Sequence, residues 1–208
     1  MKNKEIEEYL DSLYPNPKCE LNYNKDYELL IATVLSAQTT DKRVNQVTEV
    51  LFNKYKNLKE LSNADVKDIK EIIKPIGMVN KKSIFVIEIA KYLLNHCDGK
   101  VPNDREELCN IPGVGRKTTN VVLSNLYDYP AIAVDTHVSR VSKRLALAKD
   151  NDDVLTIEKK LMKIFDKKNW SRRHHQMVLF GRYHCKSAKP ECDLCKLKDI
   201  CKYYKKTF

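Results

Sequence analysis

Four cysteines close to the end of the sequence are spaced like metal ligands. They are Cys185, Cys192, Cys195 and Cys201, which fall within 17 residues of a 208-residue chain. Four unrelated buried cysteines would not crowd so closely. Zinc and iron–sulfur clusters both accept four cysteine thiolates. The spacing therefore predicts a metal site and leaves zinc and iron–sulfur open.

The stretch IPGVGRK, residues 111–117, combines two of the chain's five glycines with two cations. Gly113 and Gly115 can adopt positive φ and leave backbone N–H groups uncovered. The helix expected after them adds free N–H groups and the positive end of its dipole. Such a turn suits a phosphate, and Arg116 and Lys117 fall on the first turn of that helix. A helical hairpin that needs glycine only for its geometry is the alternative.

The composition is that of a compact, basic protein. Lys and Arg number 38 against 28 Asp and Glu, which gives a formal charge of +10, and 42% of the residues are hydrophobic. This charge favours a polyanionic partner such as nucleic acid, although a solvated cationic surface would give the same count. The sequence contains neither a signal peptide nor a run of about 20 apolar residues, so we expect a cytoplasmic protein without membrane contact. Thiols stay reduced in that compartment, which argues against a disulfide framework.

Helical periodicity runs through almost the whole chain, and no segment alternates like a strand. The predicted helices follow an N-terminal helix and span residues 28–37, 43–55, 66–73, 84–94, 104–109, 116–125, 138–147, 157–165 and 176–183. Prolines and glycines separate them, so the sequence predicts an all-α fold of about ten short helices. Asp41 and Asp135 are expected to cap the helices that follow them, and Ser62 with Asp65 resembles a capping box.

Taken together, the motifs resemble the endonuclease III family of DNA glycosylases. LCNIPGVGRKTTNVV resembles the family's helix-hairpin-helix motif, and ELLIATVLSAQTTD, IGMVNKK, AIAVDTHVSRVSKRL and GRYHC with its following cysteines occur in the family's order. The resemblance covers residues 21–201. It implies two helical lobes flanking a DNA-binding cleft. One is a six-helix bundle with the hairpin, residues 21–129, and the other combines residues 1–20 and 130–208 around a [4Fe–4S] cluster held by the four cysteines.

The resemblance also implies a function, that of a bifunctional DNA glycosylase and AP lyase of base excision repair. Lys117 takes the position of the catalytic lysine, which attacks C1′ of the sugar and forms a Schiff base whose β-elimination cuts the strand 3′ to the abasic site. On chemistry alone, a lysine at this position is better explained as a phosphate ligand. Asp135 takes the position of the catalytic aspartate, in addition to its expected role as a helix cap.

For DNA binding, the resemblance assigns roles to two further residues. Gln38 takes the position of a glutamine that fills the gap left by a flipped-out nucleotide. Met78 stands where the family commonly has leucine as an apolar wedge, and an unbranched thioether fills irregular gaps well. Gly113, Gly115 and Arg116 would contact the DNA backbone. The expected partner is double-stranded DNA with oxidised pyrimidines or abasic sites, bound by a monomer in the cytoplasm at the nucleoid.

Two other functions fit part of the pattern. The adenine glycosylase of mismatch repair shares the fold and the cluster, but it lacks the lysine and carries a catalytic glutamate where this chain has no carboxylate between Leu29 and Thr40. A non-catalytic helix-hairpin-helix binding module would not need both Lys117 and Asp135. We therefore expect an enzyme that acts on oxidised pyrimidines.

Overall fold

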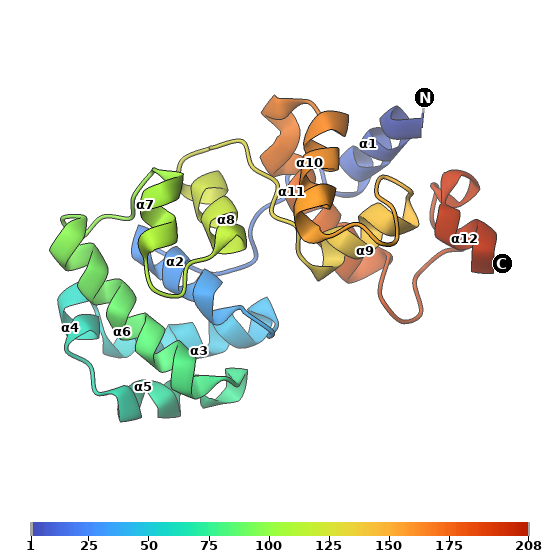
Figure 1. Cartoon of the computed structure of the whole chain (residues 1–208). Helices are drawn as coiled ribbons and strands as arrows, with labels where there is room; N and C mark the ends of the chain where they lie inside the picture. Colours follow the sequence, from blue (N-terminus) through green and yellow to red (C-terminus); the bar gives the residue numbers. More distant parts are fainter. Residues whose placement is uncertain (1, 208) are drawn as a thin grey trace. The chain divides into compact units, whose positions relative to one another are not determined.

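Helices make up all the regular secondary structure of the chain as far as it is described. The computed structural model describes residues 2–207, and within that range it contains no strand (Figure 1). The all-α fold predicted from the hydrophobic periodicity is therefore confirmed. None of the described helices is both long and apolar enough to cross a bilayer.

The chain divides into two compact units. The central unit is Glu20–Tyr127, and the terminal unit combines the chain up to Cys19 with the chain from Asp128 onward. The boundaries expected from the sequence were 20/21 and 129/130.

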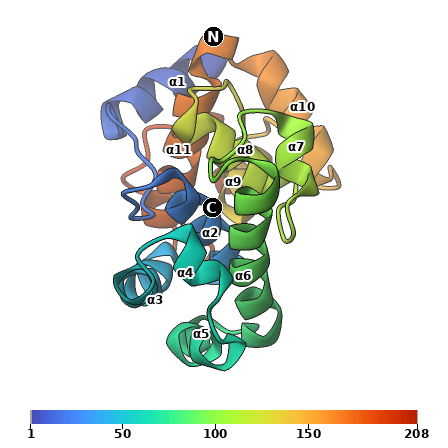
Figure 2. The ribbon, with the colours of Figure 1, turned by 90° about the vertical axis from the view of Figure 1, so that its left-hand side faces the viewer.

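The central unit is a bundle built around its first helix. Its elements are α2 (Asp26–Leu35), α3 (Asp41–Lys54), α4 (Leu58–Ser62), α5 (Val66–Ile73), the 3₁₀ turn η1 (Lys74–Ile76), α6 (Val79–His96), α7 (Arg105–Asn110) and α8 (Arg116–Leu126). Nine of the ten residues of α2 are buried, and this helix contacts α3, α6 and α8. The long helix α6 runs beside α4 and α5 (Figure 2). The short α4 is a seventh helix in the bundle, for which six were expected.

The terminal unit joins the first helix to the last third of the chain. Its elements are α1 (Lys2–Leu13), α9 (Thr136–Arg144), α10 (Val154–Ile164), η2 (Lys167–Asn169), α11 (Trp170–Leu179), the π-helical turn η3 (Phe180–His184), η4 (Lys198–Ile200) and α12 (Lys202–Thr207). Ile6 and Leu10 of α1 are fully buried in one apolar core with residues of α9, α10 and α11. The same core includes Cys201, so the cysteine segment is continuous with it.

Two predicted helix caps are wrong. Thr40, rather than Asp41, precedes α3, and its hydroxyl oxygen accepts the capping hydrogen bond. Asp65 is itself the N-cap of α5, whereas Ser62, its expected partner in a capping box, ends α4. Threonine and aspartate both cap well, so the sequence alone does not choose between neighbouring candidates.

Two helices begin about five residues or more before the start that their apolar periodicity predicts. Helix α6 begins at Val79, and α11 begins at Trp170. In both, polar side chains occupy the buried face: Lys82 in α6 and Arg173 in α11 are buried. A search for apolar residues at helical spacing does not register such positions.

Candidate functional site

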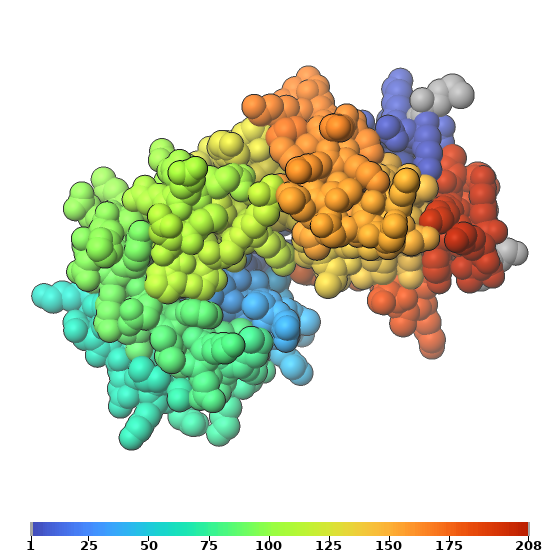
Figure 3. Space-filling view, in the orientation of Figure 1, coloured from blue at the N-terminus to red at the C-terminus, as the bar shows by residue number. Residues whose placement is uncertain are grey.

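The glycine-rich turn between α7 and α8 belongs to a segment that forms part of the visible surface of the central unit (Figure 3). Buried Ile111 and Val114 anchor the turn, and the N–H of Val114 donates to the carbonyl of Ile111 at 3.0 Å. Gly113 has a φ of +80°, and a Cβ atom there would lie 2.7 Å from the ring of Phe85. Backbone conformation and packing therefore both require glycine at this position.

The second glycine of the turn behaves differently. Gly115 is the N-cap of α8 with a φ of −107°, so it does not adopt the positive φ that glycine allows. A Cβ atom there would meet nothing within 4 Å. Internal packing does not demand glycine, yet its missing side chain leaves the first N–H groups of α8 accessible to an anion. Arg116 and Lys117 follow on the exposed first turn, which contains no acidic residue.

Asp135, in the terminal unit, is held by the helix that it caps. Its Oδ1 atom accepts a hydrogen bond from the backbone N–H of Val138 at 2.8 Å. The four residues before it, 131–134, are buried in a segment without regular secondary structure. One carboxylate oxygen is thus fixed in direction by the first turn of α9, as predicted for the cap. Lys117 belongs to the central unit, so the two expected catalytic residues stand on different units.

Gln38 and Met78 occupy two exposed turns of the central unit. Gln38 lies between α2 and α3 with a φ of +57°, and Met78 precedes α6 with a φ of +52°. The Met78 side chain is 49% exposed. Residues other than glycine rarely adopt this left-handed conformation, and such strain is common at ligand-binding sites. The sequence contained no signal for the left-handed backbone at either residue.

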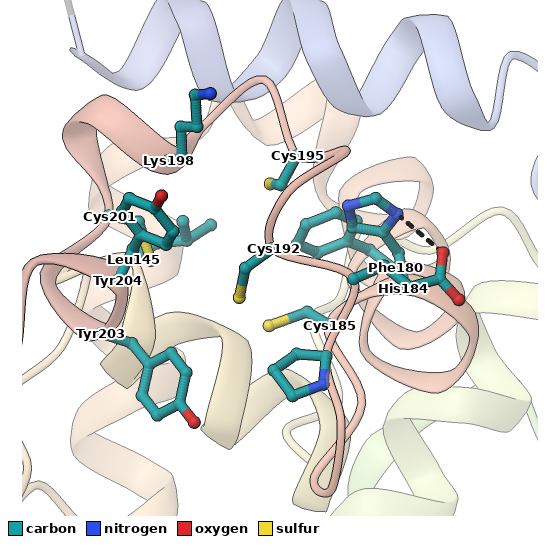
Figure 4. A pocket seen from close by; sticks show the side chains of 12 residues that line it. Leu145, Phe180, His184, Cys185, Cys192, Cys195, Lys198, Cys201, Tyr203 and Tyr204 are labelled. Atoms are coloured by element: carbon teal, nitrogen blue, oxygen red, sulfur yellow. Dashed lines mark ion pairs between the residues drawn. The ribbon is translucent and has the colours of Figure 1, made fainter. Parts of the chain in front are cut away.

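The four cysteines predicted as ligands surround one pocket of the terminal unit, with a volume of about 340 Å³ that includes its open mouth (Figure 4). The remaining lining is largely aromatic and apolar, with Phe180, His184, Tyr203 and Tyr204 among its members. The rings of Phe180 and His184 stack at 5.0 Å between centroids. Burial raises the pKa of the Cys195 thiol to about 11.

The pocket has the donor set of a metal cluster. Four thiols from three short segments face a half-enclosed space, which is the ligand type that iron–sulfur clusters use. Within residues 2–207, no group of three or more His, Cys, Asp or Glu side chains is close enough together to hold a single metal ion. A cluster with several metal ions would not require the four thiols to converge on one point.

Two arginines of α9 hold the cysteine segment in place. Arg144 donates to the carbonyls of Cys185 and Lys186, at 3.3 and 2.7 Å, and to the sulfur of Cys185 at 3.3 Å. Its guanidinium group lies 4.0 Å from the centroid of the Tyr203 ring. Arg140 donates to the carbonyl of Cys185 at 3.2 Å and to the carbonyl of Gly181 at 2.6 Å. Neither arginine was among the site residues predicted from the sequence. The signal was available, because residues four apart on one helix face the same neighbour.

Comparisons with known proteins agree on one family. The model of the HhH-GPD superfamily of base excision DNA repair proteins matches residues 31–167. The chain is similar to endonuclease III of Bacillus subtilis (strain 168), with 45% identity over 96% of this chain and 92% of the relative. Endonuclease III of Escherichia coli (strain K12) is 41% identical over 92% of this chain and 90% of its own.

A solved structure is similar to this chain in both sequence and fold. It is that of a trapped endonuclease III–DNA covalent intermediate in an estranged-adenine complex. The two structures superpose with a TM-score of 0.94 at 44% identity, over 98% of this chain and 97% of the other.

Proposed function

The chain belongs to the endonuclease III family of the HhH-GPD superfamily, and we propose that it excises oxidised pyrimidines from DNA through a Schiff base at Lys117. It is a base excision repair DNA glycosylase and AP lyase, and DNA is its partner. One observation carries the assignment of the amine: Lys117 is exposed on the first turn of α8, two residues after the glycine cap. The trapped covalent intermediate of a relative supports chemistry in which the protein bonds to its substrate.

The proposed reaction begins with the unprotonated amine of Lys117. The amine attacks C1′ of the damaged nucleotide, and the bond from C1′ to the base breaks, so that the base leaves with the electron pair and takes up a proton. The ring oxygen then leaves C1′ and is protonated, which gives the iminium. Loss of a proton from C2′ expels the phosphate oxygen from C3′ and cuts the strand. Water finally hydrolyses the imine and releases Lys117.

Asp135 is the second group of the proposal. Its carboxylate stabilises the positive charge that develops on the sugar as the base leaves. The alternative role for the same carboxylate is to accept the proton from the attacking amine. The hydrogen bond from Val138 to Oδ1 supports the stabilising role, because it fixes the direction of the carboxylate before substrate binds. A preorganised charge needs no reorganisation during the reaction.

Binding precedes the chemistry and uses the exposed turns. We propose that a DNA phosphate lies at the N-terminus of α8, against the N–H groups beside Gly113, Gly115 and Arg116. Gln38 and Met78 would enter the base stack once the nucleotide has flipped out, since their turns are exposed. DNA is the substrate, so we place the protein at the nucleoid in the cytoplasm, as a monomer.

We propose that the four cysteines hold a [4Fe–4S] cluster. When bound, the cluster supplies a covalent cross-link between the two ends of the segment from Cys185 to Cys201, which has one 3₁₀ turn as its regular structure. The purified protein should be yellow-brown and contain about four irons per chain. Stoichiometric zinc without iron, after anaerobic preparation, would contradict the cluster.

The function is tested by trapping the covalent intermediate with borohydride. Three duplexes of one sequence are compared: one with thymine glycol, one undamaged, and one with adenine opposite 8-oxoguanine. A protein–DNA adduct and strand cleavage are expected on the first duplex alone. Release of adenine from the third duplex, without an adduct on the first, would identify an adenine glycosylase. Binding without chemistry on any duplex would identify a non-catalytic module.

A further inference from the structure

One buried cation connects the two turns that carry Gln38 and Met78 in the central unit. Lys82, on the second turn of α6, is 2% exposed. Its Nζ atom donates to the carbonyl of Ala37 at 2.9 Å and to the carbonyl of Ile76 at 3.1 Å. Ala37 directly precedes Gln38, and Ile76 lies two residues before Met78. A single ammonium group therefore bridges the backbones that carry both exposed side chains.

The contacts of this lysine are unusual for a buried charge. Among the described residues, no carboxylate forms an ion pair with Lys82, and its hydrogen-bond acceptors are neutral carbonyls. Burial of an ammonium group without a counter-ion is costly, and here it lowers the pKa of Lys82. An apolar side chain would fill the space at lower cost. The ammonium group has a role that an apolar side chain could not fill. Its single nitrogen offers three donors, so it can hydrogen-bond the carbonyls of Ala37 and Ile76 at the same time.

The two turns also need an external constraint. Left-handed backbone at residues other than glycine persists only where the surrounding structure enforces it. Within the turns, the N–H of Thr39 donates to Ser36 and the N–H of Gly77 donates to Lys74, at 3.2 and 3.4 Å. Each of these bonds lies within its own turn. The two bonds from Lys82 fix one turn relative to the other.

We propose that Lys82 is a positioning residue that sets the spacing between Gln38 and Met78, so that the two side chains enter the base stack as one unit. This inference rests on the proposed function, in which both residues enter the duplex. A stack of bases leaves little tolerance in the distance between two inserted side chains, and misplacement by about 1 Å can lower a rate by about 100-fold. Lys82 contacts no DNA in this scheme and acts through the backbone of the two turns.

The test compares Lys82→Met with Lys91→Met, which removes an exposed lysine from the same helix. Base excision from a thymine glycol duplex should fall by about 10- to 100-fold in Lys82→Met and stay within about twofold in the control. Cleavage at an abasic site in single-stranded DNA, where no stack is opened, should stay within about twofold in both. Unchanged excision from the duplex would overturn the proposal, and so would an equal fall in both assays.

A binding signal separates this inference from the catalytic assignment. A duplex carries 2-aminopurine opposite a stable abasic analogue, so insertion of Gln38 and Met78 unstacks the fluorophore and no bond is broken. The fluorescence increase on binding should be large in the wild type and in Lys91→Met, and small in Lys82→Met. Equal signals would overturn the role of Lys82. Loss of the borohydride adduct in the wild type would instead refute the proposed function.

A further measurement does not depend on the folding of Lys82→Met. If the two turns act as one unit, Gln38→Ala and Met78→Ala should be coupled in the wild-type background. The double variant should then lose clearly less duplex excision than the product of the two single losses. If the losses of the two single variants simply multiply, Gln38 and Met78 do not act as one unit.

Lys82→Arg keeps a cationic donor at this position. It should therefore recover part of the fluorescence increase that Lys82→Met loses.

Discussion

Buried polar side chains reach farther along the sequence in the terminal unit than in the central unit, where the longest such bond described above, from Lys82 to Ala37, spans 45 positions. In the central unit, the hydroxyls of Thr33 and Thr48 donate to carbonyls one turn back in their own helices, at 2.7 and 3.0 Å. In the terminal unit, Arg173 and Gln176 of α11 reach α1 across more than 160 positions of sequence. Arg173 pairs with Glu7 at 2.8 Å and with Asp11 at 2.7 Å, and the amide of Gln176 donates to Asp11 at 3.0 Å.

The difference follows from chain connectivity. The central unit is one continuous segment, so all its helices are joined along the chain without an intervening unit. The terminal unit joins two segments separated by the whole central unit, so a longer loop must be closed. Directional hydrogen bonds from a buried guanidinium specify how α1 docks on α11. The proposed amine therefore stands on a self-contained unit, whereas the proposed carboxylate stands on a unit that depends on long-range polar contacts.

The largest expected effect concerns the amine on the central unit. Lys117→Gln should fold and bind damaged duplex, because Lys117 is exposed and packs into no core. It should give no borohydride adduct and no strand cleavage, and base excision should fall by about 100-fold or more. Single-turnover kinetics and a gel assay on the same duplex check both results. A variant that is still fully trapped would mean that another lysine is the nucleophile.

Removal of the carboxylate on the terminal unit should affect base excision and strand cleavage differently from removal of the amine. Asp135→Asn should slow base excision, because the loss of the negative charge removes about 3 kcal/mol of transition-state stabilisation. The amide oxygen can still cap α9, and the amine remains. Given a preformed abasic site, this variant should retain far more lyase activity than Lys117→Gln. Equal loss of lyase activity in the two variants would contradict the division of roles.

The polar network predicts an effect on stability that is confined to the terminal unit. Arg173→Met removes one arginine partner from both Glu7 and Asp11, while Asp11 keeps its pair with Arg172. The change should cost about 3 kcal/mol, the lower end for a broken buried pair, since both carboxylates are partly exposed. Hydrogen exchange should accelerate in α1 and α11 and stay unchanged in α2. Lys4→Met, which breaks an exposed pair on α1, is the control and should change little. Equal acceleration in both units would remove the contrast between them.

The same network predicts how the terminal unit responds to acid. Burial opposes ionisation of Asp11, but hydrogen bonds from Arg173 and Gln176 outweigh it and hold the pKa of Asp11 below its usual 3.8. A carboxyl group with a depressed pKa contributes stability that is present above pH 3.8 and is lost as the pH falls below it. Arg173→Met should therefore flatten the acid limb of the stability curve. An unchanged limb would show that Asp11 does not contribute.

The smallest effects should separate the two glycines of the hairpin. Gly113→Ser should cost about 1–2 kcal/mol of stability because of its left-handed backbone, with a further loss from the contact with Phe85. Gly115→Ser should preserve or slightly raise stability, because serine is a good N-cap. Its hydroxyl would occupy the N–H groups proposed for phosphate, so DNA affinity should fall. Calorimetry measures the stability of the two variants, and fluorescence anisotropy measures their affinity for DNA. Unchanged affinity in Gly115→Ser would contradict the proposed phosphate site.

Most local features could be predicted from the sequence, apart from two helix caps, whereas individual long-range side-chain contacts could not. The helix after the hairpin, the cap at Asp135 and the grouping of the four cysteines depend on residues close together in the chain, and the structure confirms them. The bridge from Lys82 to Ala37 and the contacts of Arg144 span 45 and 41 positions, respectively. Such contacts do not affect the periodicity of apolar residues, so the sequence pattern does not predict them. The starts of α6 and α11 were also missed, because polar residues occupy buried positions there.

The most direct test of the account identifies the lysine that bonds to DNA. The wild-type protein is trapped with borohydride on a thymine glycol duplex, the DNA is digested, and the modified peptide is sequenced by mass spectrometry. The account predicts one modified residue, Lys117, in a peptide that begins α8. A sugar remnant on any other lysine, or at the N-terminal amine, would contradict it.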